Sequence, residues 1–293
     1  MITFYELGNY GRLGNQLFQY AALKSLGITK GFEVKIPEYR DKIWHGQKCL
    51  LDNFLLECGT LTHEDLNKIS SVYEENFCRD MRHDHRFLTI ADNTNIRGYF
   101  QNLRYFSEHE EQIRKEFRLK SEINDQAVEH IDKLKKETGC SIVSLHVRRG
   151  DQVDGTNPNT VNFYGKNNIL SSDSIYGKYL HKAKNIFSEQ NVKFLIFSGG
   201  SRGSDDNLSD LEWCRKNFTG SEYLFSSGTN TIEDFALMKN CDHNITCHMT
   251  SFGWWAAYLN ENKQKIVVAP RHYDIEDQKL ERKNFYPKNW ILI

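Results

Sequence analysis

Short apolar runs alternate along the chain with longer segments whose apolar residues recur at helical spacing. This alternation is typical of α/β domains with parallel sheets. The short runs predict strands at 2–7, 95–100, 141–147, 192–197, 245–247 and 266–269. The periodic segments predict helices at 16–26, 106–117, 123–137, 176–187, 208–218, 232–241 and 252–259. Residues 30–92 show a mixed pattern, in which we expect only short helices.

The pattern also predicts two domains. The branched apolar run at 141–147 follows a charged helical segment that ends at Gly139, so it opens a second α/β unit. We therefore expect domains at 1–138 and 139–276, followed by a C-terminal segment at 277–293. A chain of 293 residues is long enough for two cores. The polar stretch 153–174 is expected to be a long loop, and a loop of this length is usually either functional or mobile.

Composition narrows the class of protein. A formal net charge of −1 argues against duplex nucleic acid as the partner. An odd count of seven cysteines at irregular spacing favours reduced thiols. No apolar run approaches the ~20 residues of a membrane span, and the first residues carry no secretion signal. We expect a cytoplasmic protein without a membrane span.

The strongest chemical signal lies at the end of the strand expected at 141–147. There His146, Arg148, Arg149 and Asp151 follow one another closely. Open α/β sheets bind ligands at the carboxyl ends of their strands, and arginine forks suit a diphosphate. The alternative is a structural Arg–Asp ion pair. His146 and Asp151 are also the two candidates for a catalytic base, and the sequence does not decide between them.

A second signal is the segment 8–16, which has a glycine at every third position up to Gly14. Glycine lets a backbone approach a ligand closely, and the helix expected next offers an N-terminus to an anion. Arg12 and Asn15 add polar side chains suited to a sugar. The glycine spacing is not that of a dinucleotide-binding loop, so a plain tight turn is the alternative.

A third signal precedes the aromatic helix expected at 252–259. Thr250 and Ser251 are placed to cap that helix and to bind a phosphate, and Phe252 to stack on a base. Asp234, in the preceding helix, joins this candidate binding set. The alternative is an aromatic core helix without a ligand.

Cysteine and histidine also gather between the last two helices. Cys241, His243, Cys247 and His248 have no standard zinc-finger or knuckle spacing, and zinc is therefore not favoured. We expect no metal site.

Taken together, the three segments resemble the α-1,2-fucosyltransferases, a family of inverting enzymes that use GDP-fucose. Residues 11–16 are similar to its N-terminal signature, 146–151 to its H-x-R-R-G-D signature, and 250–259 to its third block. Weaker similarity extends over 98–106 and 269–290. The chain departs from the family at 198–200, which has no Asp pair, and at Met249, where many bacterial members have Asn.

The resemblance implies a GT-B-like α/β fold, with two Rossmann-type domains facing a cleft. It implies an acceptor side in the N-terminal domain, GDP-fucose in the C-terminal one, and neither metal nor cofactor besides that donor. It places Arg148 or Arg149 on the diphosphate, with Asp151 as support.

The same resemblance places Ser251 and Phe252 by the nucleotide, and Arg12 and Asn15 between donor and acceptor. The implied acceptor is a galactose-terminated glycan, fucosylated at its 2-hydroxyl. Rival readings are an α-1,6 or protein O-linked fucosyltransferase, a nicotinamide-dependent oxidoreductase and a carbohydrate-binding module. The oligomeric state is left open.

Overall fold

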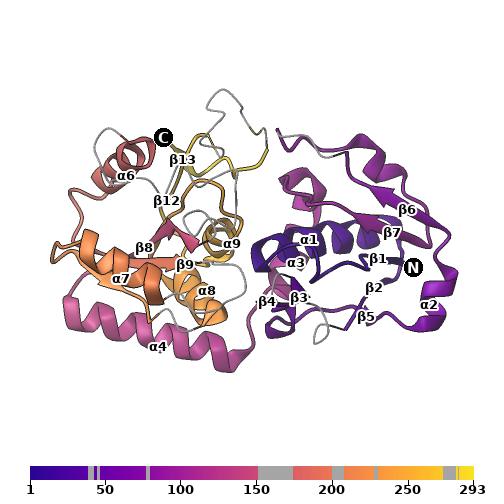
Figure 1. Ribbon diagram of the computed structural model, residues 1–293, viewed down its shortest axis with the longest axis horizontal. Helices are drawn as coiled ribbons and strands as arrows, with labels where there is room; N and C mark the ends of the chain where they lie inside the picture. The colour runs from indigo at the N-terminus through magenta and orange to yellow at the C-terminus, as the bar shows by residue number, and fades with distance from the viewer. Residues whose placement is uncertain are drawn as a thin grey trace. The chain divides into compact units, whose positions relative to one another are not determined.

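The computed structural model divides the chain into two compact units, each described here by itself (Figure 1). Unit 1 comprises Met1–Lys120 and Leu280–Lys288, and unit 2 comprises Ser121–Lys279 and Asn289–Ile293. The sequence-based boundary at 138 lies at the far end of the helix with which unit 2 begins. The structure describes residues 1–38, 43–44, 47–76, 80–150, 174–199, 208–227, 230–272, 282 and 284–293.

A five-stranded parallel sheet forms the centre of unit 1, in the order β5-β2-β1-β7-β6. The chain runs from β1 outward to β2 and β5 on one side, and β6 and β7 fill the other side. The strand order therefore reverses between β1 and β7. The strands are β1 (Ile2–Thr3), β2 (Val34–Ile36), β5 (Gly59–Thr60), β6 (Ser71–Glu74) and β7 (Thr94–Arg97), with a separate antiparallel pair of β3 (Ile43–Trp44) and β4 (Gln47–Lys48).

Helix α1 (Leu13–Lys30) is the main helix of unit 1, and most of its residues are buried. It packs on β1 and β2 on one side and on the helical turns of 103–116 on another, so apolar residues occupy several of its faces. It ends at Gly31, whose φ of 68° gives the left-handed C-cap that glycine adopts without strain. The other helices of the described part of unit 1 are η1 (Leu51–Asn53), α2 (His63–Lys68), η2 (His85–Thr89), η3 (Leu103–Tyr105), η4 (Ser107–His109) and α3 (Glu110–Glu116).

Unit 2 contains a six-stranded parallel sheet in the order β10-β9-β8-β11-β12-β13. Numbered along this unit alone, the order is 3-2-1-4-5-6, which is that of the Rossmann fold. The order reverses between β8 and β11. The strands are β8 (Ser141–Arg148), β9 (Val192–Gly199), β10 (Tyr223–Phe225), β11 (His243–Ile245), β12 (Val267–Ala269) and β13 (Ile291–Leu292).

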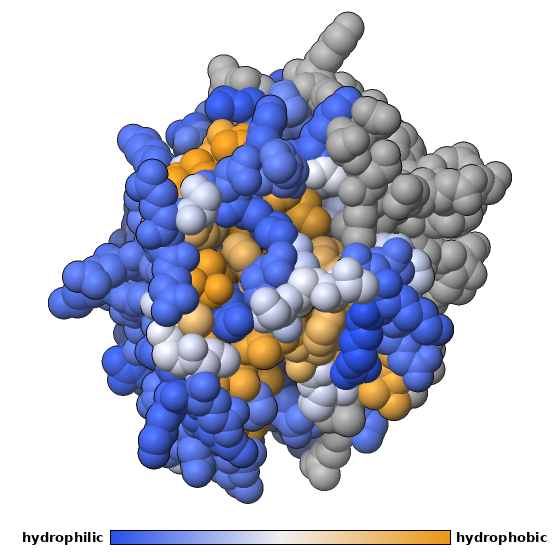
Figure 2. Space-filling view, turned by 90° about the vertical axis from the view of Figure 1, so that its left-hand side faces the viewer, coloured by the Kyte–Doolittle hydropathy of each residue, from blue (hydrophilic) through white to orange (hydrophobic). Residues whose placement is uncertain are grey.

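Helices cover the sheet of unit 2, and its inner strands are buried. β8 is buried without a break from residue 142 to residue 147, as expected for a strand covered on both faces. The described helices are α4 (Ser121–Thr138), α6 (Ile175–Asn185), α7 (Leu208–Asn217), α8 (Thr231–Asn240) and α9 (Phe252–Leu259). On the face of the molecule drawn in Figure 2, hydrophilic residues dominate and a smaller group of apolar residues gathers near the centre.

The α/β class with two Rossmann-type domains, predicted from the sequence, is confirmed. The strand expected at 2–7 is shorter than predicted, because the chain turns after Thr3 and the Leu7 amide donates to the Phe4 carbonyl at 3.0 Å. The helix expected at 16–26 begins earlier, so Gly14 and Asn15 lie inside α1 and not in a loop. Within the described residues, no helix has the length and apolar character to cross a bilayer.

Candidate functional site

Two segments singled out in the sequence meet at the carboxyl edge of the unit 2 sheet. β8 ends at Arg148, and β11 is followed by the turn that leads through Thr250 into α9. β8 and β11 are neighbours, and the strand order reverses between them. In open α/β sheets ligands bind outside the carboxyl ends of the strands at such a reversal. This edge is therefore the candidate ligand site of unit 2.

Arg149 is held by side chains of α7. Its Nε donates to Asp210 Oδ1 at 3.1 Å, and its guanidinium carbon lies 4.0 Å from the centre of the Trp213 ring. The other Asp210 oxygen accepts the Gly150 amide at 2.9 Å, and Asp210 is 6% exposed. One buried carboxylate thus fixes both the Arg149 side chain and the turn after β8. The structural ion pair considered as an alternative is present, with Asp210 as the partner.

Asp210 and Trp213 were not singled out in the sequence. They stand three residues apart in α7, a spacing that puts two side chains on the same helix face. That spacing is common in helices, so by itself it indicates no site. Only the packing of α7 against β9, the neighbour of β8, brings the pair to Arg149.

Arg148 is the last residue of β8 and is half-buried. Its charge lies close to Cys247, the residue two beyond β11. Burial raises the pKa of the Cys247 thiol to about 12, and the Arg148 guanidinium acts in the opposite direction. Arg148 therefore lies between the ends of β8 and β11. Both arginines stay candidates for a bound diphosphate, with Arg149 already oriented by α7.

His146 packs against the beginning of α9. Its Nδ1 lies 3.3 Å from Thr250 Oγ1, which also accepts the Gly253 amide at 3.1 Å. A Cβ at Gly253 would lie 2.7 Å from the same His146 nitrogen, so only glycine allows this approach. His146 is 5% exposed, and the arrangement fits a residue that positions the 250–253 turn.

Phe252 links three elements of unit 2. Its ring lies 5.9 Å from that of His146 and 5.4 Å from that of Phe235, both edge to face. Phe235 follows Asp234 in the first turns of α8, so this contact joins the N-terminal ends of α8 and α9. Trp254 and Trp255 are fully buried, so the interpretation of α9 as a core helix holds for these two residues.

Asp234 is a buried carboxyl group with an unusual pKa. It is 4% exposed, and its Oδ1 has no hydrogen-bond partner in the described part of the chain. Burial raises its pKa to about 7, the nearby Ser226 hydroxyl lowers it and the Glu233 carboxylate raises it further. An acceptor oxygen left unsatisfied inside a protein is unfavourable, and such groups often mark ligand sites.

Arg12, Gly14 and Asn15 belong to unit 1, at the beginning of α1. Arg12 precedes α1 with extended backbone, and Asn15 Oδ1 accepts from Gln101 Nε2 at 2.8 Å. Gly11 has a φ of 106°, and a Cβ there would lie 2.5 Å from the Asn15 amide nitrogen. Asp151 and the loop at 153–173 lie outside the described residues.

The Cys and His residues of the zinc hypothesis have other contacts. Cys241 donates to the Leu237 carbonyl and His243 Nδ1 accepts the Ile266 amide. Across the described ranges, no three His, Cys, Asp or Glu side chains are grouped to hold a metal. That the protein works without metal or cofactor stays a prediction.

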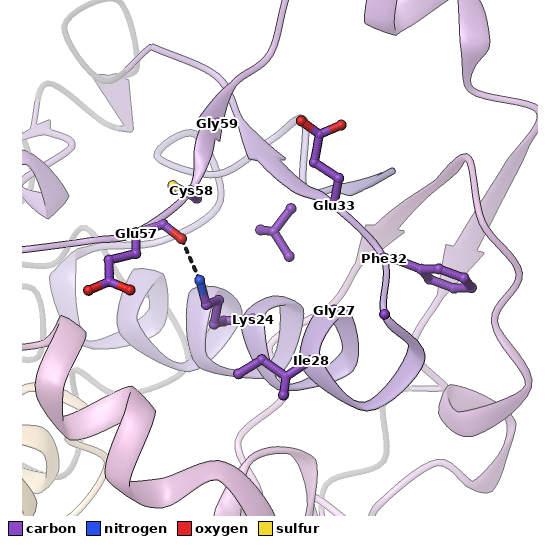
Figure 3. A pocket seen from close by; sticks show the side chains of 10 residues that line it. Lys24, Gly27, Ile28, Phe32, Glu33, Glu57, Cys58 and Gly59 are labelled. Atoms are coloured by element: carbon purple, nitrogen blue, oxygen red, sulfur yellow. Dashed lines mark hydrogen bonds between the residues drawn. The ribbon is translucent and has the colours of Figure 1, made fainter.

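A cavity of about 430 Å³ opens at the C-terminal half of α1 in unit 1 (Figure 3). Lys24, Glu33, Glu57 and Cys58 are among its lining residues, and Lys24 donates to the Glu57 carbonyl. No side chain predicted for the site lines it, so we do not assign it to the reaction.

Met249 lies in the left-handed region, with a φ of 53°. This conformation costs most L-residues about 1–2 kcal/mol, whereas Asn adopts it more easily. We expect Met249→Asn to raise the free energy of unfolding by about 0.5–1 kcal/mol, measured by denaturant unfolding. Met81→Asn, at a φ of 50° in unit 1, is the matched control for the backbone effect and should also stabilise. A loss of stability in both variants would contradict this account.

Comparison with known proteins gives the family. A model described as glycosyl transferase family 11 matches residues 2–293. An α-1,2-colitosyltransferase of Escherichia coli is 26% identical over 97% of this chain and 96% of its own length. A galactoside α-(1,2)-fucosyltransferase 2 of Rattus norvegicus is 26% identical over 87% of this chain and 66% of its own.

A crystal structure of the fucosyltransferase NodZ from Bradyrhizobium superposes with a TM-score of 0.50 and 16% identity, covering 88% of this chain and 91% of NodZ. At that identity the likeness concerns the fold alone, and it agrees with the GT-B-like class expected from the sequence. The resemblance to α-1,2-fucosyltransferases stated from three sequence blocks is confirmed by the family match. The chain belongs to glycosyl transferase family 11.

Proposed function

We propose that this glycosyltransferase moves L-fucose from GDP-fucose to the 2-hydroxyl of a terminal galactoside, with inversion and without a metal ion. The observation that carries the proposal is that Arg148 ends β8 beside β11, at the reversal of a Rossmann sheet, where His146 of β8 contacts Thr250 before α9. The α-1,2 linkage is in the names of both relatives described above, although one transfers colitose and the other fucose. The donor sugar is therefore part of the test.

Arg148 and the beginning of α9 would hold the diphosphate. An Arg fork binds phosphate oxygens and keeps its charge while negative charge develops on the leaving GDP. Ser251 precedes the first turn of α9, whose free amides and positive dipole end favour the same anion. Arg149, engaged by Asp210 and Trp213, would position the turn that carries Arg148.

Asp234 would recognise the base. Guanine carries N–H donors on adjacent ring and exocyclic nitrogens, and a carboxylate accepts both. The unpartnered Oδ1 of Asp234 is an acceptor awaiting such a donor. Phe252, at the start of α9, would contact the face of the nucleoside. Both side chains follow the carboxyl end of a strand in the same sheet.

In the reaction, the acceptor oxygen bonds to the anomeric carbon of fucose while the bond from that carbon to the phosphate oxygen breaks. GDP leaves with the electron pair, and the hydroxyl proton passes to a base. His146 is 5% exposed and contacts Thr250, which favours a positioning role. Asp151 is then the remaining candidate for the base among the residues named in the sequence.

We expect GDP to stabilise the protein in the absence of any divalent metal. A ligand that binds only the native state at a hundredfold excess over its Kd adds about 2.7 kcal/mol. Thermal unfolding with GDP, in the presence and absence of a chelator, measures this. A shift that disappears with the chelator would contradict metal-free binding, and a shift with NAD but not with GDP would favour the oxidoreductase.

The reaction product shows which sugar is transferred and which linkage is formed. The full chain is incubated with GDP-fucose or GDP-colitose and a panel of β-galactosides, and the linkage is determined by NMR. The proposal predicts an α-1,2-linked fucose on galactose. An α-1,6 product would instead indicate an α-1,6-fucosyltransferase, and transfer only to a peptide would indicate a protein O-fucosyltransferase.

A further inference from the structure

Two tyrosines in unit 1 form a stacked pair. The rings of Tyr10 and Tyr99 lie 4.9 Å apart at an interplanar angle of 25°. Tyr10 is 38% exposed although it stacks, and Tyr99 is half-buried. Tyr10 follows β1, and Tyr99 follows β7. The pair thus stands at the carboxyl ends of the two strands between which the order of this sheet reverses, where open α/β sheets bind ligands.

Hydrogen bonds from one buried side chain join the two loops that carry the tyrosines. Gln19, a fully buried residue of α1, donates through Nε2 to the Tyr10 carbonyl at 2.7 Å and to the Gly98 carbonyl at 3.3 Å. A single buried amide therefore bridges the residue that carries one ring and the residue before the other. Buried amides in such networks rigidify the elements they join.

The second loop is also fixed at its far side. The Glu75 carboxylate accepts the Tyr99 amide at 2.8 Å and the Phe100 amide at 2.9 Å. Phe100 has a φ of 51°, a left-handed conformation that is unfavourable for a bulky residue. Strain of this kind persists only where the surroundings enforce it, and it is frequent at binding sites. The enforced turn presents the Tyr99 ring to Tyr10.

A buried polar side chain follows the second tyrosine in the chain. Gln101, two residues after Tyr99, donates to Asn15 at 2.8 Å and is 5% exposed. Its Oε1 has no hydrogen-bond partner within the described residues. An exposed aromatic face suits a pyranose, whose C–H face packs on rings.

We propose that Tyr10 and Tyr99 form a platform for the acceptor's terminal sugar. The proposal rests on the proposed function, since it assigns the acceptor of that reaction to this surface. A purely structural role is the competing explanation, because the Tyr10 ring also covers Phe4 at 6.3 Å, edge to face. The experiment must separate the two.

The test compares Tyr10→Leu, Tyr10→Phe and Tyr99→Leu in the full chain. Leucine keeps an apolar cover over Phe4 but lacks the flat ring, whereas phenylalanine keeps the ring. We expect the leucine variants to raise the KM for a β-galactoside about tenfold, the loss of one aromatic contact, and Tyr10→Phe to change it less than threefold. GDP-induced thermal stabilisation should match that of the unaltered protein. Ile28→Ala, which removes an exposed apolar side chain of α1, is the matched control.

A second readout separates this proposal from the first. Saturation-transfer NMR with methyl β-galactoside detects acceptor binding without any transfer. Binding that is lost in Tyr10→Leu supports the platform even if GDP-fucose proves not to be the donor. Equal NMR binding and equal acceptor KM in folded Tyr10→Leu and Tyr99→Leu would overturn it, as would a leucine variant that loses GDP stabilisation and acceptor binding together.

Discussion

Arg148→Lys is expected to lower kcat by about two orders of magnitude while leaving thermal stability almost unchanged. Lysine keeps the positive charge but loses the planar fork that binds two phosphate oxygens at once. Because Arg148 ends β8 and Arg149 is held by α7, the effect on turnover should fall on Arg148. Steady-state kinetics with GDP-fucose and a β-galactoside, together with thermal unfolding, measure both quantities.

Arg149→Lys is the matched control, one residue further along the chain. It loses the bond from Nε to Asp210 and the stacking on Trp213, both within a partly buried contact. We expect a loss of about 1–3 kcal/mol in the free energy of unfolding and a smaller loss of kcat than in Arg148→Lys. The opposite pattern, with turnover abolished only in Arg149→Lys, would exchange the roles of the two arginines.

The sequence predicted the elements of unit 2 well where they are long and fully covered. The apolar runs of β8 and β9 and the aromatic run of α9 leave little choice of structure, since their length, branching and burial all agree. Their order along the chain then predicts a parallel sheet. Two of the three blocks that carry the family resemblance belong to these elements, one at the end of β8 and one over α9.

The sequence was a poor guide in residues 30–92, where β2, β5 and β6 were missed. These strands have two to four residues, too few for any alternation of apolar and polar positions. β10 and β13, equally short, were missed in unit 2 for the same reason. Such strands exist because a neighbouring strand supplies the hydrogen bonds, which is information about the sheet as a whole.

The sequence also did not predict which residues hold the site residues in place. Asp210 lies 61 residues after Arg149, and Gln19 reaches Gly98 across 79 residues. Neither Asp210 nor Gln19 differs by its local sequence from an ordinary helix residue. Their contacts follow from the packing of α7 and α1 on the two sheets, which a local pattern does not encode.

Asp234→Asn is expected to stabilise the protein above neutral pH and to weaken GDP binding. Burial raises the folded-state pKa of this carboxyl to about 7, above its ordinary value of 3.8. The group therefore favours the folded state at low pH, and this contribution is lost as the pH rises from about 4 through about 7. At pH 8 the difference amounts to about 4 kcal/mol, which the neutral asparagine should restore. Denaturant unfolding from pH 4 to pH 8 measures how the free energy of unfolding changes with pH in the unaltered protein and in Asp234→Asn.

The same carboxylate, once ionised, is the better acceptor for the two guanine N–H groups. GDP affinity of the unaltered protein should therefore rise as the pH passes through about 7, and Asp234→Asn should bind GDP about tenfold to a hundredfold more weakly, as for a lost charged hydrogen bond. Glu233→Gln, at the exposed neighbouring position, removes a charge that raises the pKa of Asp234, so it should shift the pH dependence toward lower pH and leave GDP affinity at pH 8 unchanged. Stability gained without loss of GDP affinity would make Asp234 a buried carboxyl with no part in donor recognition. Higher stability together with weaker GDP binding in Asp234→Asn would support the proposed role. The buried carboxylate would then destabilise the free protein and gain its hydrogen-bond donors from the nucleotide.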